Sequence, residues 1–170
     1  MARRPRDDGA LVRDAQRGSE DALEQLFRRH WGQAQRAAYL VVHDAAAAED
    51  IAQEAFLAAV RHLDRFDRRR PFAPWLHRIV VNRAIDWSRA RALRAETGMV
   101  DSPAADTTEG LGDELAGAIG ALPVEQRGVI VLRHLLGYTP GEIAGLLELP
   151  RGTVNSRLRR GLDTLGEHLE

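Results

Sequence analysis

A run of polar and basic residues near the C-terminus has the composition of a DNA-reading surface. Between Arg151 and Arg160 the sequence holds four arginines and no acidic residue. Arginine can form paired hydrogen bonds with guanine, asparagine can pair with adenine, and hydroxyl groups can bind phosphate. The alternative is a solvated face of an ordinary helical bundle. The candidate DNA-contacting residues are Arg151, Thr153, Asn155, Ser156, Arg157, Arg159 and Arg160.

A helix-turn-helix would position these side chains. The segment Thr139-Pro140-Gly141-Glu142 is a capping box with proline at the first helical position. The box predicts the start of a short helix over 140–147. The residues that follow predict a turn over 149–152 and a second helix over 151–168. In such a motif the second helix enters the major groove. The residues expected to face the core from the second helix are Val154, Leu158, Leu162 and Leu165.

A second candidate surface lies on the helix expected over 44–63. At roughly 100° per residue, one side of this helix is apolar and the opposite side is a polar stripe. Leu57 is an apolar residue within that stripe, and it is either an anchor for a protein partner or an ordinary exposed leucine. The apolar side contains Ala52, Ala55, Phe56, Ala59 and Leu63. The stripe contains Asp50, Gln53, Glu54, Leu57 and Arg61.

A third candidate surface follows the charged loop expected over 64–71. Aromatic side chains stack on unpaired bases and arginines follow the phosphate backbone, so this surface suits single-stranded DNA. The alternative is that Trp75 belongs partly to the core and that the arginines pair with Asp86. The candidate residues of loop and helix are Arg68, Arg69, Arg70, Trp75, Arg78, Asn82 and Arg89.

The composition argues against several kinds of chemistry. The chain has no Cys, and all 24 of its basic residues are Arg. A disulfide, a thiolate metal site, a P-loop lysine and a Schiff-base lysine are therefore excluded. The six His residues are scattered, and no catalytic triad is recognisable. We expect a protein that is not an enzyme and that has no cofactor and no metal.

The sequence also contains no sign of a membrane protein. No apolar run reaches membrane-spanning length, and the N-terminus lacks the apolar core of a signal peptide. We therefore expect a soluble, cytoplasmic protein without membrane insertion.

Helical periodicity dominates the whole chain, so the expected fold class is all-α. We expect two small helical domains joined by a flexible acidic linker, with the helix-turn-helix in the C-terminal domain. The domains are 1–94 and 111–170, and the linker is 95–110. The remaining helices are expected over 10–17, 19–43, 72–93, 111–121 and 124–136, with Ser19 and Asp44 as N-caps.

The net charge of −1 hides an uneven distribution of charge. Residues 71–94 carry five Arg and one acidic residue, and residues 127–160 carry six Arg and two acidic residues. Residues 95–126, between them, carry seven acidic residues and no Arg. Two basic segments that flank an acidic tether are typical of a protein that contacts DNA at two points.

Taken together, the chain resembles bacterial RNA polymerase sigma factors of the extracytoplasmic-function (ECF) type over residues 10–169. The order of the matching segments is specific, although each segment alone is not. They are Gly18 to Phe27, Ala48 to Leu57, Phe72 to Asn82 with Asp86, and Gly152 to Leu158 preceded by Leu122-Pro123.

The resemblance implies a role for each surface. The stripe around Leu57 would grip the coiled coil of the polymerase clamp. The loop at 65–72, with Trp75, Arg78 and Asn82, would melt the −10 region and capture a flipped base. The helix-turn-helix would read the −35 region, with Leu132 to Leu136 near the polymerase flap, and the linker would run toward the RNA exit path.

The resemblance further implies regulation by an anti-sigma factor. The partners expected are therefore core RNA polymerase, promoter DNA and an anti-sigma factor. Two other functions stay open. One is a helix-turn-helix regulator that binds duplex DNA without polymerase, and the other is a sigma-like decoy that does not initiate transcription.

Overall fold

The computed structural model describes residues 7–98 and 111–169, and every regular element in these two ranges is a helix. The all-α class is therefore confirmed. The N-terminal half contains α1 (Asp8–Gln16), α2 (Glu20–Val42), α3 (Ala45–His62), a 3₁₀ turn η1 (Leu63–Arg65) and α4 (Phe72–Glu96). The C-terminal half contains α5 (Leu111–Ala121), α6 (Val124–Ile130), a π-helical turn η2 (Val131–Leu135), α7 (Pro140–Leu147) and α8 (Arg151–Leu169). Most of the predicted linker lies outside the described residues.

Short polar side chains begin the N-terminal helices where the sequence predicts. The Ser19 hydroxyl accepts a hydrogen bond from the Ala22 amide, and the Asp44 carboxylate accepts one from the Ala47 amide. Each cap satisfies an amide that has no partner within the helix. The cap of α1 is Asp7, so that helix begins two residues before the predicted start.

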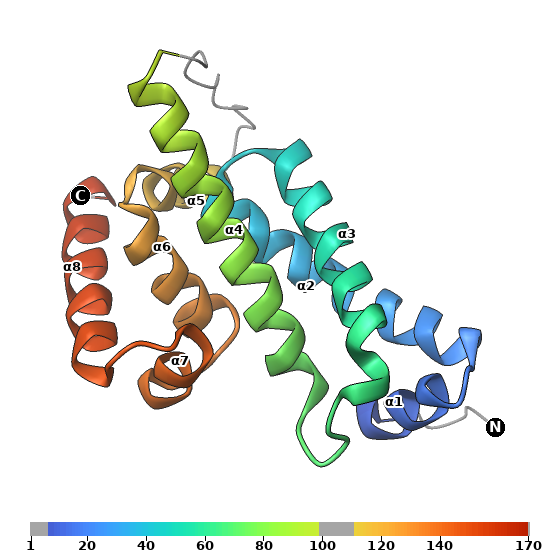
Figure 1. Cartoon of the computed structure of the whole chain (residues 1–170). Helices are drawn as coiled ribbons and strands as arrows, with labels where there is room; N and C mark the ends of the chain where they lie inside the picture. The colour runs from blue at the N-terminus through green and yellow to red at the C-terminus, as the bar shows by residue number, and fades with distance from the viewer. Residues whose placement is uncertain (1–6, 99–110, 170) are drawn as a thin grey trace.

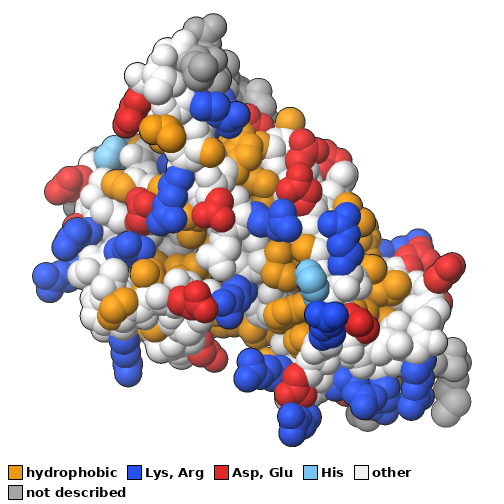
Figure 2. Space-filling view, viewed as in Figure 1, with side chains coloured by type: hydrophobic (Ala, Val, Ile, Leu, Met, Phe, Trp, Pro, Cys, Tyr) orange, Lys and Arg blue, Asp and Glu red, His pale blue; other side chains and the backbone are white. Residues whose placement is uncertain are grey.

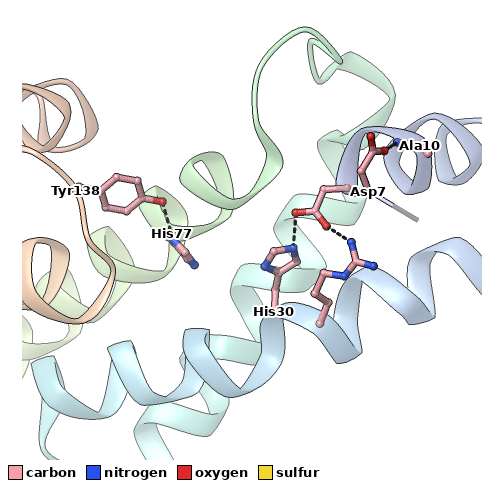
Figure 3. Close-up of polar contacts among 7 residues, drawn as sticks. Asp7, Ala10, His30, His77 and Tyr138 are labelled. Carbon is pink, nitrogen blue, oxygen red and sulfur yellow. Dashed lines mark hydrogen bonds and ion pairs between the residues drawn. The ribbon is translucent and has the colours of Figure 1, made fainter. Parts of the chain in front are cut away.

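The core of the N-terminal half lies between α2, α3 and α4, and α1 packs across one end of it (Figure 1). Asp8 holds α1 in place, because its carboxylate lies 2.8 Å from the buried His30 Nε2 and 2.7 Å from the Arg29 guanidinium. Figure 3 shows His30 pointing toward the start of α1. The predicted apolar side of α3 is buried as expected.

The C-terminal half is built around α6, α7 and α8. Val154, Leu158 and Leu165 of α8 are buried, as predicted, but Leu162 is 46% exposed and its assignment to the core is wrong. The reason is that Gly161 takes the core position, where an added Cβ would lie only 3.1 Å from Ile130 Cγ1. The close approach of α6 and α8 turns Leu162 toward the edge of the contact.

The two halves pack directly against each other, which the sequence does not predict. Figure 1 shows α4 running between the other N-terminal helices and the C-terminal helices. Gly128 of α6 makes this contact close, because a Cβ there would lie 2.8 Å from Ile85 Cδ1 of α4. Likewise, a Cβ on Gly120 of α5 would lie 2.9 Å from the His43 ring at the end of α2. The buried side chains of both halves form one continuous core.

Candidate nucleic-acid interface

The capping box and the two helices of the predicted helix-turn-helix are present. The Thr139 hydroxyl accepts from the Glu142 amide at 3.3 Å, and the Thr139 amide donates to the Glu142 carboxylate at 2.7 Å. This amide hydrogen bond lowers the pKa of Glu142, so the carboxylate form is favoured. The box sets where α7 begins, and α8 follows it directly after the turn.

The candidate residues of α8 form a polar face opposite its buried seam. Arg151, Asn155, Arg159 and Arg160 are exposed, whereas Thr153, Ser156 and Arg157 are half-buried. The Ser156 hydroxyl donates to the Thr153 carbonyl at 3.1 Å, so its hydrogen is already used within the helix. The face that remains is mainly one of guanidinium groups, which suit phosphates and guanine edges.

The single-strand surface contains a pocket of about 530 Å³ between the α3–α4 loop, the start of α4 and α7. Of the predicted residues, it brings together Arg70, Trp75 and Arg78. The Trp75 ring lies 4.5 Å from the Phe66 ring, in contact with the core, and is half-buried. Trp75 therefore belongs partly to the core, and its side chain also lines the pocket. The other lining residues are Arg65, Phe66, Asp67 and Pro71, which belong to the predicted loop, and His62, Pro74 and Leu146, which the sequence does not indicate.

The three consecutive arginines do not all present a free cation. Arg69 forms two hydrogen bonds with Asp67, at 3.0 and 3.1 Å, and these hydrogen bonds lower the pKa of Asp67. Arg68, Arg69 and Arg70 also line a second hollow of about 400 Å³ on the α1 side of the loop. Figure 2 shows basic side chains gathered along the lower edge of the molecule, where Figure 1 places this loop.

Arg89 and Asn82 lie farther along α4. Arg89 lies eleven residues after Arg78, which corresponds to about 16 Å of helix, so the structure does not bring it to the pocket. It pairs instead with Glu125 of α6 at 3.1 Å, and with Asp86 at 4.0 Å. The predicted alternative, a pair with Asp86 within the helix, is present. Asn82 lies between Arg78 and Arg89 in the sequence, and its side chain is half-buried.

The polar stripe of α3 is exposed throughout, and Leu57 is 55% exposed within it. Leu57 and Gln53 line an apolar groove of about 370 Å³ between α2 and α3. Glu54 pairs with Arg83 of α4 at 3.1 Å. The remaining stripe residues, Asp50 and Arg61, are exposed.

Sequence patterns missed two apolar residues beside Leu57. Phe27 and Val60 line the same groove, and they are 41% and 49% exposed. Val60 follows Leu57 by three residues, and that spacing alone predicts neighbouring side chains on a helix. Phe27 is an apolar residue of the helix predicted over 19–43, and only the packing shows that its side chain is uncovered. The surface around Leu57 is therefore more apolar than the stripe alone suggests.

Within residues 7–98 and 111–169, no group of three or more His, Cys, Asp or Glu side chains could hold a metal ion. None of the helices in 7–98 and 111–169 is long and apolar enough to cross a membrane.

Comparison with known proteins identifies both halves of the chain. The family Sigma-70 region 2 matches residues 26–94, and the family Sigma-70 region 4 matches residues 112–165. The ECF RNA polymerase sigma factor SigM of Mycobacterium tuberculosis is 36% identical over 93% of this chain and 82% of its own length. SigW of Bacillus subtilis is 30% identical over 93% of this chain and 94% of its own length.

A solved structure matches the fold as well. CnrH, solved in complex with the cytosolic domain of CnrY, is 32% identical and has a TM-score of 0.72. The match covers 95% of this chain and 96% of CnrH. Matches in both halves and over nearly the full length agree with the geometry described above, so the chain belongs to the ECF family of RNA polymerase sigma factors.

Proposed function

We propose that this sigma factor directs promoter-specific transcription initiation through three surfaces of its own. The polar stripe with Leu57 binds core RNA polymerase, α8 reads −35 duplex DNA, and the pocket at the start of α4 holds the melted −10 strand. The observation that carries this proposal is the pocket that gathers Arg70, Trp75 and Arg78 in a chain that also has a helix-turn-helix. A protein that binds only duplex DNA has no use for such a pocket.

The pocket supports capture of an unpaired base. Unstacking a base costs a few kcal/mol, and stacking on an aromatic ring together with hydrogen bonds can offset that cost. Trp75 and Phe66 supply ring faces, and Arg70 and Arg78 supply guanidinium groups at the same hollow. Asn82, farther along the same helix, is the candidate for a hydrogen bond to a base. Arg68 and Arg69, on the same loop, are the candidates for contacts to the phosphates of the strand, and Arg69 would exchange its hydrogen bonds to Asp67 for such a contact. Arg89 lies beyond the pocket.

The polymerase surface combines an apolar centre with a polar rim. Protein interfaces of this kind draw most of their affinity from a few central anchors. The groove beside Leu57 offers such a centre, and the acidic and amide groups of the stripe surround it. We assign the coiled coil of the polymerase clamp to this surface. The half-buried Leu135 and Leu136 are the candidates for the flap, since Leu132 is fully buried.

The proposal extends to a protein regulator and to the place of action. The structure of CnrH was solved with a second protein bound, which supports a regulatory partner such as an anti-sigma factor for this chain too. Since bacterial promoters and polymerase lie in the cytoplasm, the chain acts there. It needs no catalytic residue, because polymerase carries out the bond-forming chemistry. A decoy that binds polymerase without initiating remains the second candidate.

Replacing Arg157 and Arg160 by alanine should weaken −35 duplex binding by the holoenzyme. If each guanidinium neutralises one phosphate, each substitution should make the fall of log affinity with log salt concentration less steep by about one unit of slope. The measurement is a salt titration of binding to a −35 duplex. Arg36→Ala, at an exposed position on α2 outside the proposed surfaces, is the matched control. An unaltered slope in both test variants would show that α8 has only a structural role.

A further inference from the structure

A glutamine at the end of α1 joins this helix to the connection between α3 and α4. The Gln16 Nε2 atom lies 2.8 Å from the Leu63 carbonyl oxygen and 3.0 Å from the Phe66 carbonyl oxygen. Carbonyl oxygens only accept hydrogen bonds, so the side chain must face both of them with its NH₂ group. That group has two hydrogens, and each carbonyl receives one of them.

The two carbonyls lie where the chain leaves helical geometry and enters the loop that carries the three arginines. Leu63 begins η1, and Phe66 follows it with extended backbone angles, φ −68° and ψ 130°. The Leu63 carbonyl already accepts from the Phe66 amide at 3.1 Å, which closes the turn. The Phe66 carbonyl does not continue a helix and needs a partner elsewhere, and Gln16 supplies it. The glutamine therefore fixes the direction in which the chain leaves η1.

The helix that carries Gln16 is itself held in place. Leu11 and Val12 of α1 are buried, and Asp8 joins the start of the helix to His30 of α2. Figure 1 shows α1 lying beside the connection between α3 and α4. Asp8 and Val12 also line the second hollow, together with the three arginines of the loop. A fixed α1 can therefore fix the loop through its last side chain.

The part of the loop that Gln16 holds forms a wall of the proposed −10 pocket. The half-buried Phe66 lines this pocket, and its ring lies 4.5 Å from the Trp75 ring. Asp67 comes next and begins a tight turn, because its carboxylate accepts from the Arg69 amide and its carbonyl accepts from the Arg70 amide, both at 3.0 Å. A shift at Phe66 would therefore move the ring, the turn and the guanidinium groups together.

We propose that Gln16 is a positioning residue for the −10 pocket. Through the Leu63 and Phe66 carbonyls it holds the α3–α4 loop in the geometry that receives an unpaired base, and it does not itself contact DNA. A loop that is ordered before binding avoids part of the entropy cost of binding. The inference rests on the proposed function of the pocket. It gives α1, which lies outside the three proposed surfaces, a role in promoter opening.

Two substitutions of Gln16 test this role. Gln16→Met keeps a long, unbranched side chain and removes both donors, and Gln16→Asn keeps the amide on a side chain that is one methylene shorter. Gln25→Met is the matched control, because the Gln25 amide donates only to Asp21 of the same helix, at 2.8 Å. If Gln16→Met does not fold, the comparison rests on Gln16→Asn.

The measurement is binding of a labelled −10 single strand by holoenzyme that contains each variant. The strand comes from a promoter that the parent holoenzyme transcribes, and a series of strands carries an abasic site at each position in turn. In the parent, loss of the captured base should weaken binding by about tenfold or more. Gln16→Met should bind the intact strand about tenfold more weakly and should lose little more when that base is absent.

This lack of additivity separates positioning from a general effect on stability, which would weaken intact and abasic strands by the same factor. Affinity for core polymerase and for a −35 duplex should stay within about twofold of the parent, and Gln25→Met should change nothing. Unchanged binding of the intact strand, equal losses for intact and abasic strands, or a parallel loss of affinity for core polymerase would overturn the role of Gln16. The proposed function fails by a separate result, because a parent holoenzyme that tolerates an abasic site at every position captures no base.

Discussion

Replacing Leu57 by aspartate should abolish binding of the chain to core RNA polymerase and leave its fold intact. The side chain is 55% exposed and lies at the edge of the apolar groove between α2 and α3. A carboxylate there would be desolvated by the partner without a matching cation. Truncating a central anchor of an interface typically costs about 2 kcal/mol or more, or about 30-fold in affinity, and an inserted charge should cost more.

The measurement is the affinity of the labelled chain for core polymerase. Leu93→Asp is the control, because Leu93 is 63% exposed near the end of α4 and lies outside the groove. The free energy of unfolding of both variants, measured by thermal denaturation, should stay within about 0.5 kcal/mol of the parent value, as is usual for surface substitutions. If Leu57→Asp binds polymerase with the parent affinity, Leu57 is an ordinary exposed leucine and the groove is not the clamp site.

Replacing Asn82 by alanine should impair open-complex formation much more than binding of closed promoter duplex. An asparagine that pairs with an extruded base acts only after melting, and such a paired contact is worth about 1–3 kcal/mol, or about 5- to 150-fold. Asn82 is half-buried on α4, between the two arginines that hold Glu148 and Glu125.

Open complexes can be followed by permanganate reactivity of the −10 thymines, and closed complexes by duplex binding at low temperature. Arg157→Ala serves as the contrasting variant, because loss of a −35 contact should weaken both complexes together. An equal loss in both measurements for Asn82→Ala would contradict a role with a flipped base.

Local features of the fold could be predicted from the sequence because they depend on neighbouring residues. Ser19, Asp44 and Thr139 cap their helices as predicted, since a short polar side chain satisfies amides two or three residues ahead. The exposed stripe of α3 follows from helical periodicity alone.

Contacts between distant segments could not be predicted in the same way. Gly128 and Gly161 have no side chain and therefore add nothing to a pattern of apolar and polar residues, yet both permit close helix packing. Gly161 takes the core position that the pattern assigns to Leu162. The π-helical turn at Val131–Leu135 also lies within a segment predicted as one regular helix.

The candidate sites show the same difference between local features and contacts of distant segments. Residues on one face of one helix, such as the Leu57 stripe, follow from their spacing in the sequence. The pocket depends on the packing of three elements, so the spacing that indicates Trp75 and Arg78 does not indicate Leu146 of α7. The pairing of Arg78 with Glu148, seventy residues later, depends on how the two halves meet.

Reconstituted transcription tests the central claim most directly. Core polymerase, this chain and a library of random promoter sequences would be combined, and the starts of the transcripts would be sequenced. Initiation should depend on the added chain, and the active promoters should share one element near −35 and another near −10. No initiation above core polymerase alone, with correctly folded chain that binds polymerase, would contradict the account and favour a decoy.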